Sequence, residues 1–532
     1  MNTYIYKTKK YIIAQILFDL AGVSCLALSP LLQQWLFDYG LESSFKMILL
    51  IILAYGSLLL FYTLSQYFCM IFAFKGGIQF ENLLKKDFLS SVFHMDSSTF
   101  YKHSIGEYIS LQGNDITALE QDYLEPIISI IRCINMIIVY GIVLFFGVDW
   151  RIALMIIVTS IFAILIPKLI GKTLTDARNV YQEQMAVYVT AITDLLEGFH
   201  IINLVTLKKI LDKHEKVLNE TAEKRYLYGK KKSMVLGVSE LTTKIVKIFT
   251  FGLVAILFYK KEITVGTGVA TLSYVSSFIE PIDSVLYNIT TIQSMKDVKK
   301  KVLSYHQNNP PYTLPQKNVF DSNISLENVT FKRGNFVLEN VNLTIKKGLK
   351  YAVIGQSGAG KSTFFKLIMG YEKMNSGNIT IDNENLRDFD TSELISYTDQ
   401  NEHIYKAGIE DNVTVFHSYN MEKMHSMKKN IPSEFFEELL NRNGTDCQCF
   451  SGGEKQVIAF LRMLVKNAEV ILLDEPFSAM DAKTKSAVEH YLFTGEELKG
   501  KTILVITHDT SEESLSQYDR IIHIEDTGIY ME

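Results

Sequence analysis

The chain has no surplus of positive charge and little cysteine. Its 532 residues carry 53 lysines and arginines against 58 aspartates and glutamates, a net charge of −5. Because nucleic-acid-binding proteins usually show a basic surplus, we expect no nucleic-acid partner. The 5 cysteines are too few and too scattered for a disulfide framework, so we expect reduced thiols. Cys447 and Cys449 look like a metal-binding pair, but no second Cys or His pair lies at ligand spacing.

Long apolar runs fill the first half of the chain. They lie at 11–36, 46–74, 126–147, 151–170, 236–258 and 265–289. Each is near the roughly 20 residues that a bilayer core requires, so the sequence predicts six transmembrane helices. The first run is too long for a signal peptide and lacks a small-residue cleavage site.

Lysine and arginine are divided unevenly between the connections of these helices. Lys7, Lys9, Lys10 and the long connections 75–125 and 171–235 carry most of them. Positively charged connections stay on the inner side of a membrane, so we expect both termini in the cytoplasm. The long inner connections are rich in helix formers and poor in Pro and Gly, so the helices are expected to continue into the cytoplasm. Soluble loops are the alternative for these connections.

A change of composition marks a domain boundary after the sixth run. The stretch 307–322 contains three prolines and reads as an extended linker. From 323 onward, apolar alternation and short apolar runs indicate a soluble α/β domain. We therefore predict a transmembrane domain at 1–306, a linker at 307–322 and a nucleotide-binding domain at 323–532.

A phosphate-binding pattern organises this second domain. It comprises Gly355, Gln356, Ser357, Gly358, Ala359, Gly360, Lys361, Ser362 and Thr363, directly after the apolar run 351–354. These residues fit the P-loop pattern GxxxxGK[ST], which places a glycine-rich turn between a strand and a helix. Backbone N–H groups and the helix N-terminus would bind phosphates, with Lys361 at the β- and γ-phosphates. The Ser362 hydroxyl would hold Mg²⁺.

Two further apolar runs end in polar residues at what we expect to be the same edge of a sheet. The run 470–473 is followed by Asp474 and Glu475, and the run 502–506 is followed by Thr507 and His508. The carboxyl ends of parallel strands face the ligand in open α/β sheets. Asp474 would hold Mg²⁺ through water, and Glu475 would polarise the attacking water.

Further motifs resemble those of the ATP-binding cassette (ABC) transporters. They are the signature residues Ser451, Gly452 and Gly453 within 450–454, the Q-loop residue Gln400, the D-loop residue Asp481 within 478–481, and His508 at the place of the switch histidine. The resemblance implies that Glu475, His508 and Gln400 are catalytic, that Gln400 also approaches Mg²⁺, and that the signature and Asp481 contact ATP.

Six membrane helices followed by one cassette resemble an exporter-type half-transporter of this family. The implied fold is an α-helical membrane domain followed by an α/β P-loop NTPase domain of the ABC type. In the family two cassettes sandwich two ATP molecules, so the chain must pair, with a homodimer preferred over a heterodimer. The stretches 105–107 and 196–198 resemble the family's coupling regions, and the expected location is a bacterial plasma membrane.

Residues in two motifs depart from the family pattern, and in the signature Phe450 replaces the usual leucine. Arg333 stands where an aromatic residue usually stacks on adenine, and Phe336 is a possible substitute. Weaker discrimination between ATP and GTP is therefore expected, because base stacking contributes about 1–3 kcal/mol in nucleic-acid binders. Glu454 replaces the usual glutamine of the signature.

Charged residues also occur within the membrane runs. Glu240, Lys244 and Lys247 share one helix face in the fifth run, and the others are Glu280 and Asp283 in the sixth, Asp19 in the first and Arg132 in the third. Charges are costly against lipid, so these side chains should face a watery cavity or one another. Contact with cargo and mutual pairing both remain open.

The sequence thus supports an ATP-driven exporter of an amphipathic substrate, with a peptide preferred over a lipid or a drug. An importer built on the exporter fold is a second interpretation. A membrane ATPase that gates or senses without transport is a third.

Overall fold

The computed structural model describes residues 1–532 except 42, 96, 308–313, 334–335, 357, 401, 431–438, 440–445 and 526–527. Side chains at 97–98, 160–172, 175, 239, 243, 276, 279, 282–283, 286, 306–307, 333, 336 and 427–430 also lie outside the description. The chain forms two units. Unit 1 comprises Met1–Phe93 and Ile105–Asn308, and unit 2 comprises His94–Ser104 and Asn309–Glu532.

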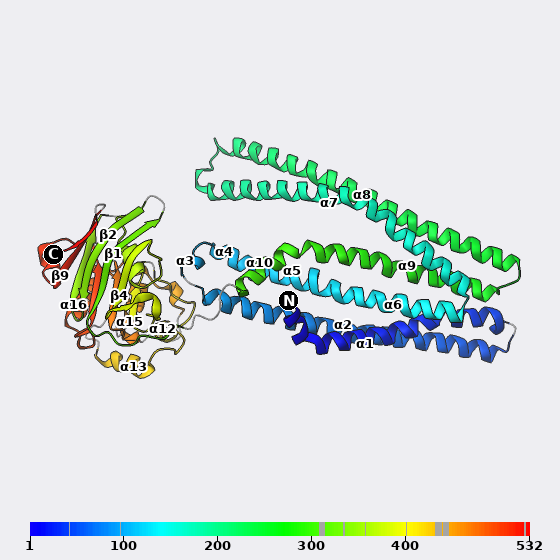
Figure 1. Ribbon diagram of the computed structural model, residues 1–532, viewed down its shortest axis with the longest axis horizontal. Helices are drawn as coiled ribbons and strands as arrows, with labels where there is room; N and C mark the ends of the chain where they lie inside the picture. The colour runs from blue at the N-terminus through cyan, green and yellow to red at the C-terminus, as the bar shows by residue number, and fades with distance from the viewer. Residues whose placement is uncertain are drawn as a thin grey trace. The chain divides into compact units, whose positions relative to one another are not determined.

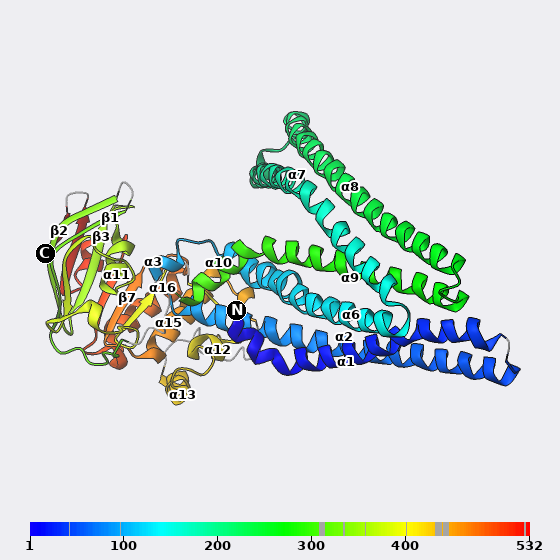
Figure 2. The ribbon, with the colours of Figure 1, turned by 45° about the vertical axis from the view of Figure 1, so that its right-hand side comes forward.

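Unit 1 is built from helices. They are α1 (Asn2–Trp35), α2 (Phe45–Phe93), α4 (Ile105–Ser110), α5 (Ile116–Leu119), α6 (Glu125–Gly147), α7 (Trp150–Glu197), α8 (Leu207–Tyr259), α9 (Val265–Ser294) and α10 (Lys296–Gln307). Short π-helical or 3₁₀ segments join them: η1 (Leu36–Gly40), η2 (Leu111–Asp115), η3 (Glu120–Leu124) and η4 (Phe199–Ile201). Helix α1 packs along α2, α6 along α9, and α7 along α8 (Figures 1 and 2).

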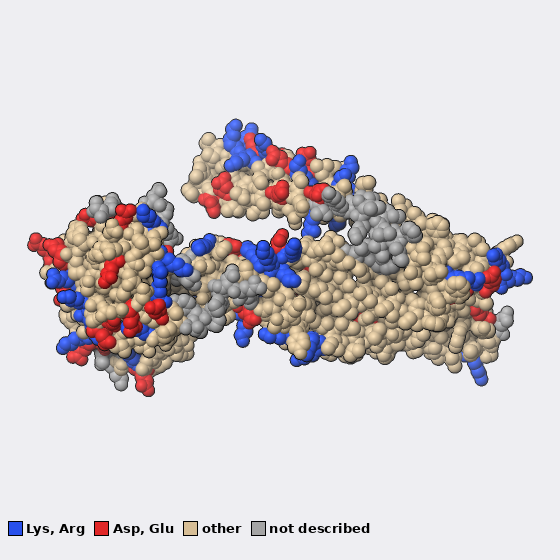
Figure 3. All heavy atoms as spheres, viewed as in Figure 1, with Lys and Arg blue, Asp and Glu red and all other residues tan. Residues whose placement is uncertain are grey.

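Four stretches among the described residues are long and apolar enough to cross a membrane. They are Asn2–Gly40, Phe45–Phe93, Ile105–Gly147 and Leu207–Tyr259. The fourth and sixth predicted spans lie in α7 and α9, whose described apolar stretches are Trp150–Thr159 and Val265–Val275. On the face shown in Figure 3, the charged side chains of unit 1 gather toward the ends of the helices and leave an uncharged belt between them. The chain is an integral membrane protein.

The expected continuation of the membrane helices beyond the bilayer is confirmed. Helix α7 has 48 residues and α8 has 53. At 1.5 Å per residue these helices are about 70–80 Å long, against about 30 Å for the hydrocarbon core. In α8 the buried residues Thr242, Val246, Thr250 and Val254 recur every four positions, so one face packs inward.

Unit 2 is an α/β domain to which a short piece of the first half belongs. This piece is His94–Ser104, with helix α3 (Ser97–Phe100). The strands are β1 (Asn323–Arg333), β2 (Phe336–Lys346), β3 (Lys350–Gly355), β4 (Ser376–Ile381), β5 (Glu384–Asn385), β6 (Ile395–Thr398), β7 (Val470–Asp474), β8 (Thr502–Ile506), β9 (Arg520–Glu525) and β10 (Gly528–Met531). The helices are α11 (Lys361–Ile368), α12 (Ile409–Thr414), α13 (Met421–Asn430), α15 (Gly452–Lys466), α16 (Ala482–Thr494) and α17 (Glu512–Leu515). Short 3₁₀ segments are η5 (Leu386–Asp388), η6 (Cys447–Cys449) and η7 (Glu496–Leu498).

The strands form two sheets. The order in one is β2-β1-β4-β5, all antiparallel, and in the other β10-β9-β3-β8-β7-β6. In the second sheet β3, β6, β7, β8 and β9 pair in parallel and β10 is antiparallel to β9. Strands β7 and β8 are buried at every position, which explains why their sequences are continuous apolar runs. The parallel pairing brings the ends of β3, β6, β7 and β8 to one edge.

Candidate functional site

The P-loop joins β3 to α11 through two left-handed glycines. Gly358 has φ +84° and Gly360 has φ +92°, a backbone conformation that residues with a side chain rarely adopt. At Gly355 a Cβ atom would meet the Ile524 carbonyl oxygen of β9, so only glycine fits there. The Lys361 ammonium donates to the carbonyl oxygens of Gly355 at 2.8 Å and Gln356 at 3.0 Å. The lysine is thus fixed across the loop, and the predicted Ser357 lies outside the described residues.

Oxygen ligands suitable for a metal ion meet beside the start of α11. The Ser362 side chain hydrogen-bonds Asp474 at the end of β7. The Tyr397 hydroxyl lies 3.4 Å from Asp474 Oδ2 and 3.2 Å from Asp399 Oδ2, so it can donate its one proton to either carboxylate. Burial raises the pKa of Asp474, and its hydrogen bond with Ser362 opposes that shift. Carboxylate and hydroxyl oxygens are ligands that Mg²⁺ prefers, so these residues fit the ion.

Glu475 lies between the two other residues predicted to be catalytic. Gln400 Nε2 donates to Glu475 Oε2 at 2.8 Å, and His508 Nε2 lies 2.6 Å from Glu475 Oε1. The three residues follow β6, β7 and β8, whose parallel pairing brings their ends together. Glu475 itself has φ +48°, which is uncommon for a residue with a side chain. Strained backbone of this kind clusters at functional sites.

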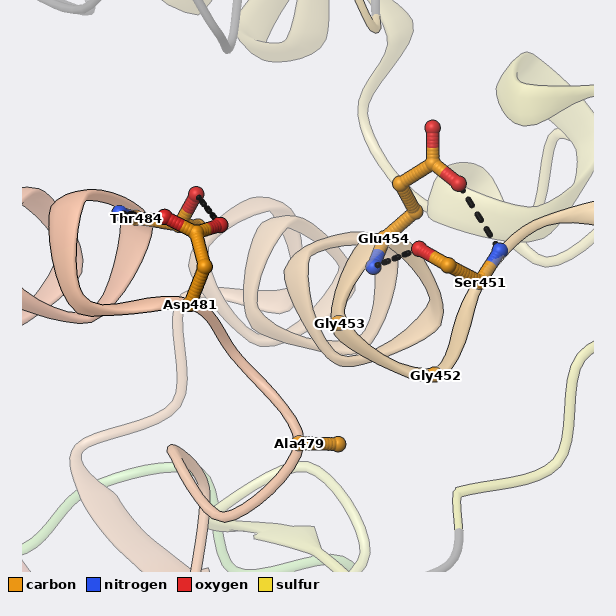
Figure 4. Close-up of a pocket in the computed structure, with 7 residues that line it drawn as sticks. All are labelled: Ser451, Gly452, Gly453, Glu454, Ala479, Asp481 and Thr484. Atoms are coloured by element: carbon orange, nitrogen blue, oxygen red, sulfur yellow. Dashed lines mark hydrogen bonds between the residues drawn. The ribbon is translucent and has the colours of Figure 1, made fainter.

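The signature residues begin helix α15. Ser451 is the N-cap, its Oγ accepts from Glu454 N at 3.3 Å, and Glu454 Oε2 accepts from Ser451 N at 2.8 Å (Figure 4). Glutamate thus completes a capping box at the position where the family usually has glutamine. A Cβ on Gly453 would lie 2.9 Å from the Ala479 carbonyl oxygen, so this glycine lets the helix approach the D-loop.

A pocket of about 390 Å³ opens at the signature. It is lined by Ser451, Gly452, Gly453, Glu454, Ala479, Asp481 and Thr484 (Figure 4). Asp481 caps α16 by accepting from Lys483 N at 3.0 Å and Thr484 N at 3.1 Å. The pKa of Asp481 is lowered, mainly because its carboxylate accepts a hydrogen bond from the Thr484 hydroxyl. Among the described residues, none from the P-loop lines this pocket.

The charged residues of the membrane runs fall into two groups. Asp19 and Arg132 form a pair, with Arg132 Nε donating to Asp19 Oδ1 at 3.1 Å, and Gln66 Nε2 donates to the same oxygen at 3.3 Å. Lys244 Nζ lies 2.7 Å from Glu240 Oε1, and both side chains are more than 60% exposed (62% and 68%).

The remaining predicted cargo residues are Lys247, Glu280 and Asp283. Lys247 and Glu280 are exposed, whereas the side chain of Asp283 lies outside the described residues. Side chains of Arg333 and Phe336, which bear on adenine stacking, also lie outside them.

Comparisons with known proteins agree with this arrangement. The family model "ABC transporter transmembrane region" matches residues 12–282, and "ABC transporter" matches residues 338–478. The chain belongs to the ABC transporters. As such it couples ATP hydrolysis to transport across a membrane, and its half-transporter organisation requires a second cassette.

Curated relatives of this ABC transporter cover most of its length. The multidrug resistance-like ATP-binding protein MdlB of Buchnera aphidicola is 23% identical, over 94% of this chain and 89% of that protein. An ATP-dependent lipid A-core flippase of Vibrio parahaemolyticus is 24% identical, over 84% and 79%. A solved structure of a bacterial Atm1-family ABC exporter with ATP bound has a TM-score of 0.77 and 17% identity, covering 98% of this chain and 94% of that one. That likeness shows the exporter fold.

The contacts of Gln456 were not predicted from the sequence. Gln456, a buried polar residue of α15, donates from Nε2 to Ser478 Oγ at 3.1 Å and accepts from Ala479 N at 3.0 Å. It holds the D-loop against the signature helix. The only signal in the sequence is a glutamine at an otherwise apolar helix position, five residues after Ser451.

Proposed function

We propose that two copies of this chain form a homodimeric, ATP-driven exporter of an amphipathic substrate. The observation that carries the proposal is that no described P-loop residue lines the signature pocket of the same chain. A signature that lies apart from its own P-loop needs the P-loop of a second chain to complete an ATP site. In the proposed dimer each ATP lies between Lys361 of one protomer and Ser451 of the other.

The proposed hydrolytic site uses residues from three strand ends. Ser362, Asp474 and Gln400 would hold Mg²⁺, which neutralises charge on the phosphates when bound. Glu475 polarises the attacking water, and His508 and Gln400 hold Glu475 in place through the hydrogen bonds described above. Phosphoryl transfer needs positioning and charge neutralisation rather than covalent chemistry, and these residues supply both.

The tip of the α7–α8 hairpin supports the dimer. Phe199, Leu204 and Val205 are 73%, 95% and 86% exposed at the end of two very long helices. Exposed apolar side chains at the tip of a helical hairpin favour docking, and we propose that they bind the partner's ATPase domain.

The proposed domains are 1–306 and 323–532, joined by the linker 307–322. The distribution of lysine and arginine between the connections supports a cytoplasmic location of both termini in a bacterial cell.

The proposed cargo class follows from the charged face of α8. Glu240, Lys244 and Lys247 lie on the side of the helix away from the buried face at Thr242 and Val246. Because charges are costly against lipid, this face should border a watery cavity between protomers. A cavity with apolar walls and a few charges suits an amphipathic molecule. We prefer a peptide as the substrate. Because two relatives are named for lipid A-core and multidrug transport, a lipid and a drug are tested as alternatives.

The direct test is transport into inside-out vesicles that contain the purified chain. Accumulation of a labelled amphipathic peptide, dependent on ATP, is expected, with a lipid and a cationic drug measured in parallel. Greater accumulation of the lipid or the drug would overturn the peptide preference alone. Uptake into right-side-out cells would instead identify an importer, and substrate-independent ATPase without flux would identify a gate or sensor.

Expression of this chain alone is expected to give an active dimer with two equivalent ATP sites. The hydrolytic residues are complete within the chain, so no partner with different motifs is required. Light scattering for mass and an ATPase assay check this expectation. A stable but inactive protein that a second half-transporter rescues would replace the homodimer with a heterodimer.

The double change Lys244→Ala and Lys247→Ala is expected to lower substrate-stimulated ATPase while basal ATPase and thermal stability stay normal. Contacts to charged groups contribute about 1.5–3 kcal/mol, so substrate affinity should fall roughly 10–100-fold. The matched control is Lys231→Ala with Lys232→Ala, two exposed lysines of the same helix away from the hairpin tip. A fall in thermal stability without a fall in substrate-stimulated ATPase would show that the lysines form structural pairs. No change in either property would show that the cavity lies elsewhere.

A further inference from the structure

Helix α15 begins at the signature and contacts two loops of unit 2, the D-loop and the segment that follows Gln400. Its first turn carries Ser451 as the cap, and Gln456 on the next turn holds the D-loop. Arg462 lies about 16 Å further along the axis than Ser451, at 1.5 Å per residue. This arginine contacts the segment that follows Gln400.

Arg462 uses all three nitrogen groups of its side chain. Nε donates to the Asn412 carbonyl oxygen at 2.8 Å, Nη1 to Glu402 Oε1 at 3.0 Å, and Nη2 to the His403 carbonyl oxygen at 3.1 Å. The side chains of Arg462 and Glu402 are only 15% and 18% exposed. A guanidinium that makes several directed bonds in a partly buried place fixes orientation as well as charge.

The two carboxylate oxygens of Glu402 bind different partners. Its Oε2 accepts from Asp399 N at 3.4 Å, the residue before Gln400, while Oε1 binds Arg462. Burial raises the pKa of Glu402 and Arg462 opposes that shift. Because Gln400 donates to Glu475 at 2.8 Å, a continuous chain of contacts runs from the signature helix to the catalytic carboxylate.

The loop between Glu402 and α12 is itself rigidly held. Asn412 is fully buried, and its Nδ2 donates to the carbonyl oxygens of Tyr405 at 3.1 Å, Ala407 at 3.2 Å and Gly408 at 3.0 Å. Its Oδ1 accepts from Tyr405 N at 2.8 Å. We expect a loop whose backbone is bound in this way to move as one piece, so that a shift of α15 would be passed on through Arg462 rather than absorbed.

We propose that the Glu402–Arg462 ion pair is a positioning device that ties Gln400 to the signature helix and thereby couples the two ATP sites of the dimer. The inference rests on the proposed dimer, in which Gln400 faces the ATP of its own P-loop and Ser451 faces the ATP held by the partner. Closure on one ATP moves α15, and the ion pair carries that movement to Gln400 and Glu475 of the other site.

The test compares Glu402→Gln with the wild-type full chain in ATPase titrations. Glutamine has nearly the same shape but removes the charge that holds the guanidinium. For the wild type we expect a Hill coefficient for ATP above 1. For the variant we expect a Hill coefficient near 1 and a kcat lower by about tenfold, with unchanged binding of a labelled ATP analogue at the P-loop. Arg462→Lys keeps the charge without the fork and is expected to change both values in the same direction.

The matched control is Glu469→Gln, which removes another short ion pair of unit 2, to Lys501 Nζ at 3.0 Å, away from the signature and the Q-loop. Its Hill coefficient and kcat should equal those of the wild type. A wild-type Hill coefficient in Glu402→Gln would overturn the coupling role. The same would follow if Glu469→Gln lost as much cooperativity and kcat as Glu402→Gln, in proportion to its lower melting temperature. A dimeric wild type with a Hill coefficient of 1 would also overturn it and leave the dimer standing. A wild type that hydrolyses ATP as a monomer would overturn the proposed function itself.

Discussion

The change Glu475→Gln is expected to stop ATP turnover while ATP binding persists. Hydrolysis should fall by about 10²–10⁴-fold, the usual loss when a positioned base is removed. Lys361, Ser362 and Asp474 remain in place to bind phosphate and metal, so affinity for ATP should stay near the wild-type value. ATPase rate and equilibrium binding of a labelled nucleotide, measured on the same preparation, check the two halves of this expectation.

The hydrogen bonds of Glu475 explain why so small a change should matter. Its two oxygens accept separately from Gln400 and from His508, at 2.8 and 2.6 Å. Glutamine has one acceptor oxygen and one NH₂ donor, so it can still accept from Gln400, but the His508 Nε2 would then have to accept from it in the other tautomer. The substitution therefore removes the charge and also changes the hydrogen-bonding role of the imidazole.

Glu469→Gln is the control for this prediction as well. Glu469 directly precedes strand β7, whereas Glu475 directly follows it, so the two changes are chemically identical at opposite ends of one strand. The control should hydrolyse ATP at the wild-type rate. If purified Glu475→Gln also does so, another residue polarises the water and the proposed role of Glu475 is wrong.

The sequence was sufficient to predict the residues that gather at the sheet edge. Glu475 and His508 each follow an apolar run, and the parallel pairing of β7 and β8 is what such runs predict. Gln400 follows the mixed stretch Ile395–Thr398, so it was expected at this site only from its resemblance to the family's Q-loop. Their roles in hydrolysis stay predictions until the variants are measured. The family signature was equally visible, because Ser451, Gly452 and Gly453 match the family pattern, and Gly453 also lets α15 approach the Ala479 carbonyl oxygen.

Contacts between distant segments were beyond the sequence. Arg462 and Glu402 lie 60 positions apart, and nothing in either local pattern says that they meet. Gln456 was passed over for the same reason, since its partner Ala479 lies 23 positions further along the chain. One sequence contains charges and periodicities, but pairing across a fold depends on how helices and sheets pack.

In the membrane half the helices were predicted better than their ends. Helix α1 begins at Asn2, well before the apolar run that starts at Tyr11. The first turns are polar yet stay helical, and Lys9 places its ammonium 3.8 Å from the centre of the Tyr6 ring. Apolar runs report where a helix meets lipid and not where it stops, which is also why α7 and α8 extend so far beyond their runs.

The change Arg132→Ala is expected to destabilise the membrane domain strongly. The Asp19 side chain is only 2% exposed, and its Oδ1 accepts from both Arg132 and Gln66, whereas Oδ2 is buried with no hydrogen-bond partner in the described structure. Removing one member of a fully buried ion pair leaves an uncompensated charge and typically costs about 3–5 kcal/mol. Because the Arg132 side chain is 32% exposed, we expect a cost near the lower end of this range. A thermal unfolding scan of the purified protein measures the effect.

Two further variants separate a lost charge balance from lost packing in this pair. The double change Asp19→Asn with Arg132→Gln removes both charges, so it should recover much of the stability that Arg132→Ala loses. Lys213→Ala removes an ion pair to Asp194 whose side chains are 62% and 70% exposed, and it should cost no more than about 1 kcal/mol. If Arg132→Ala melts at the wild-type temperature, the pair does not hold α1 to α6, and Asp19 and Arg132 return to the residues available for cargo.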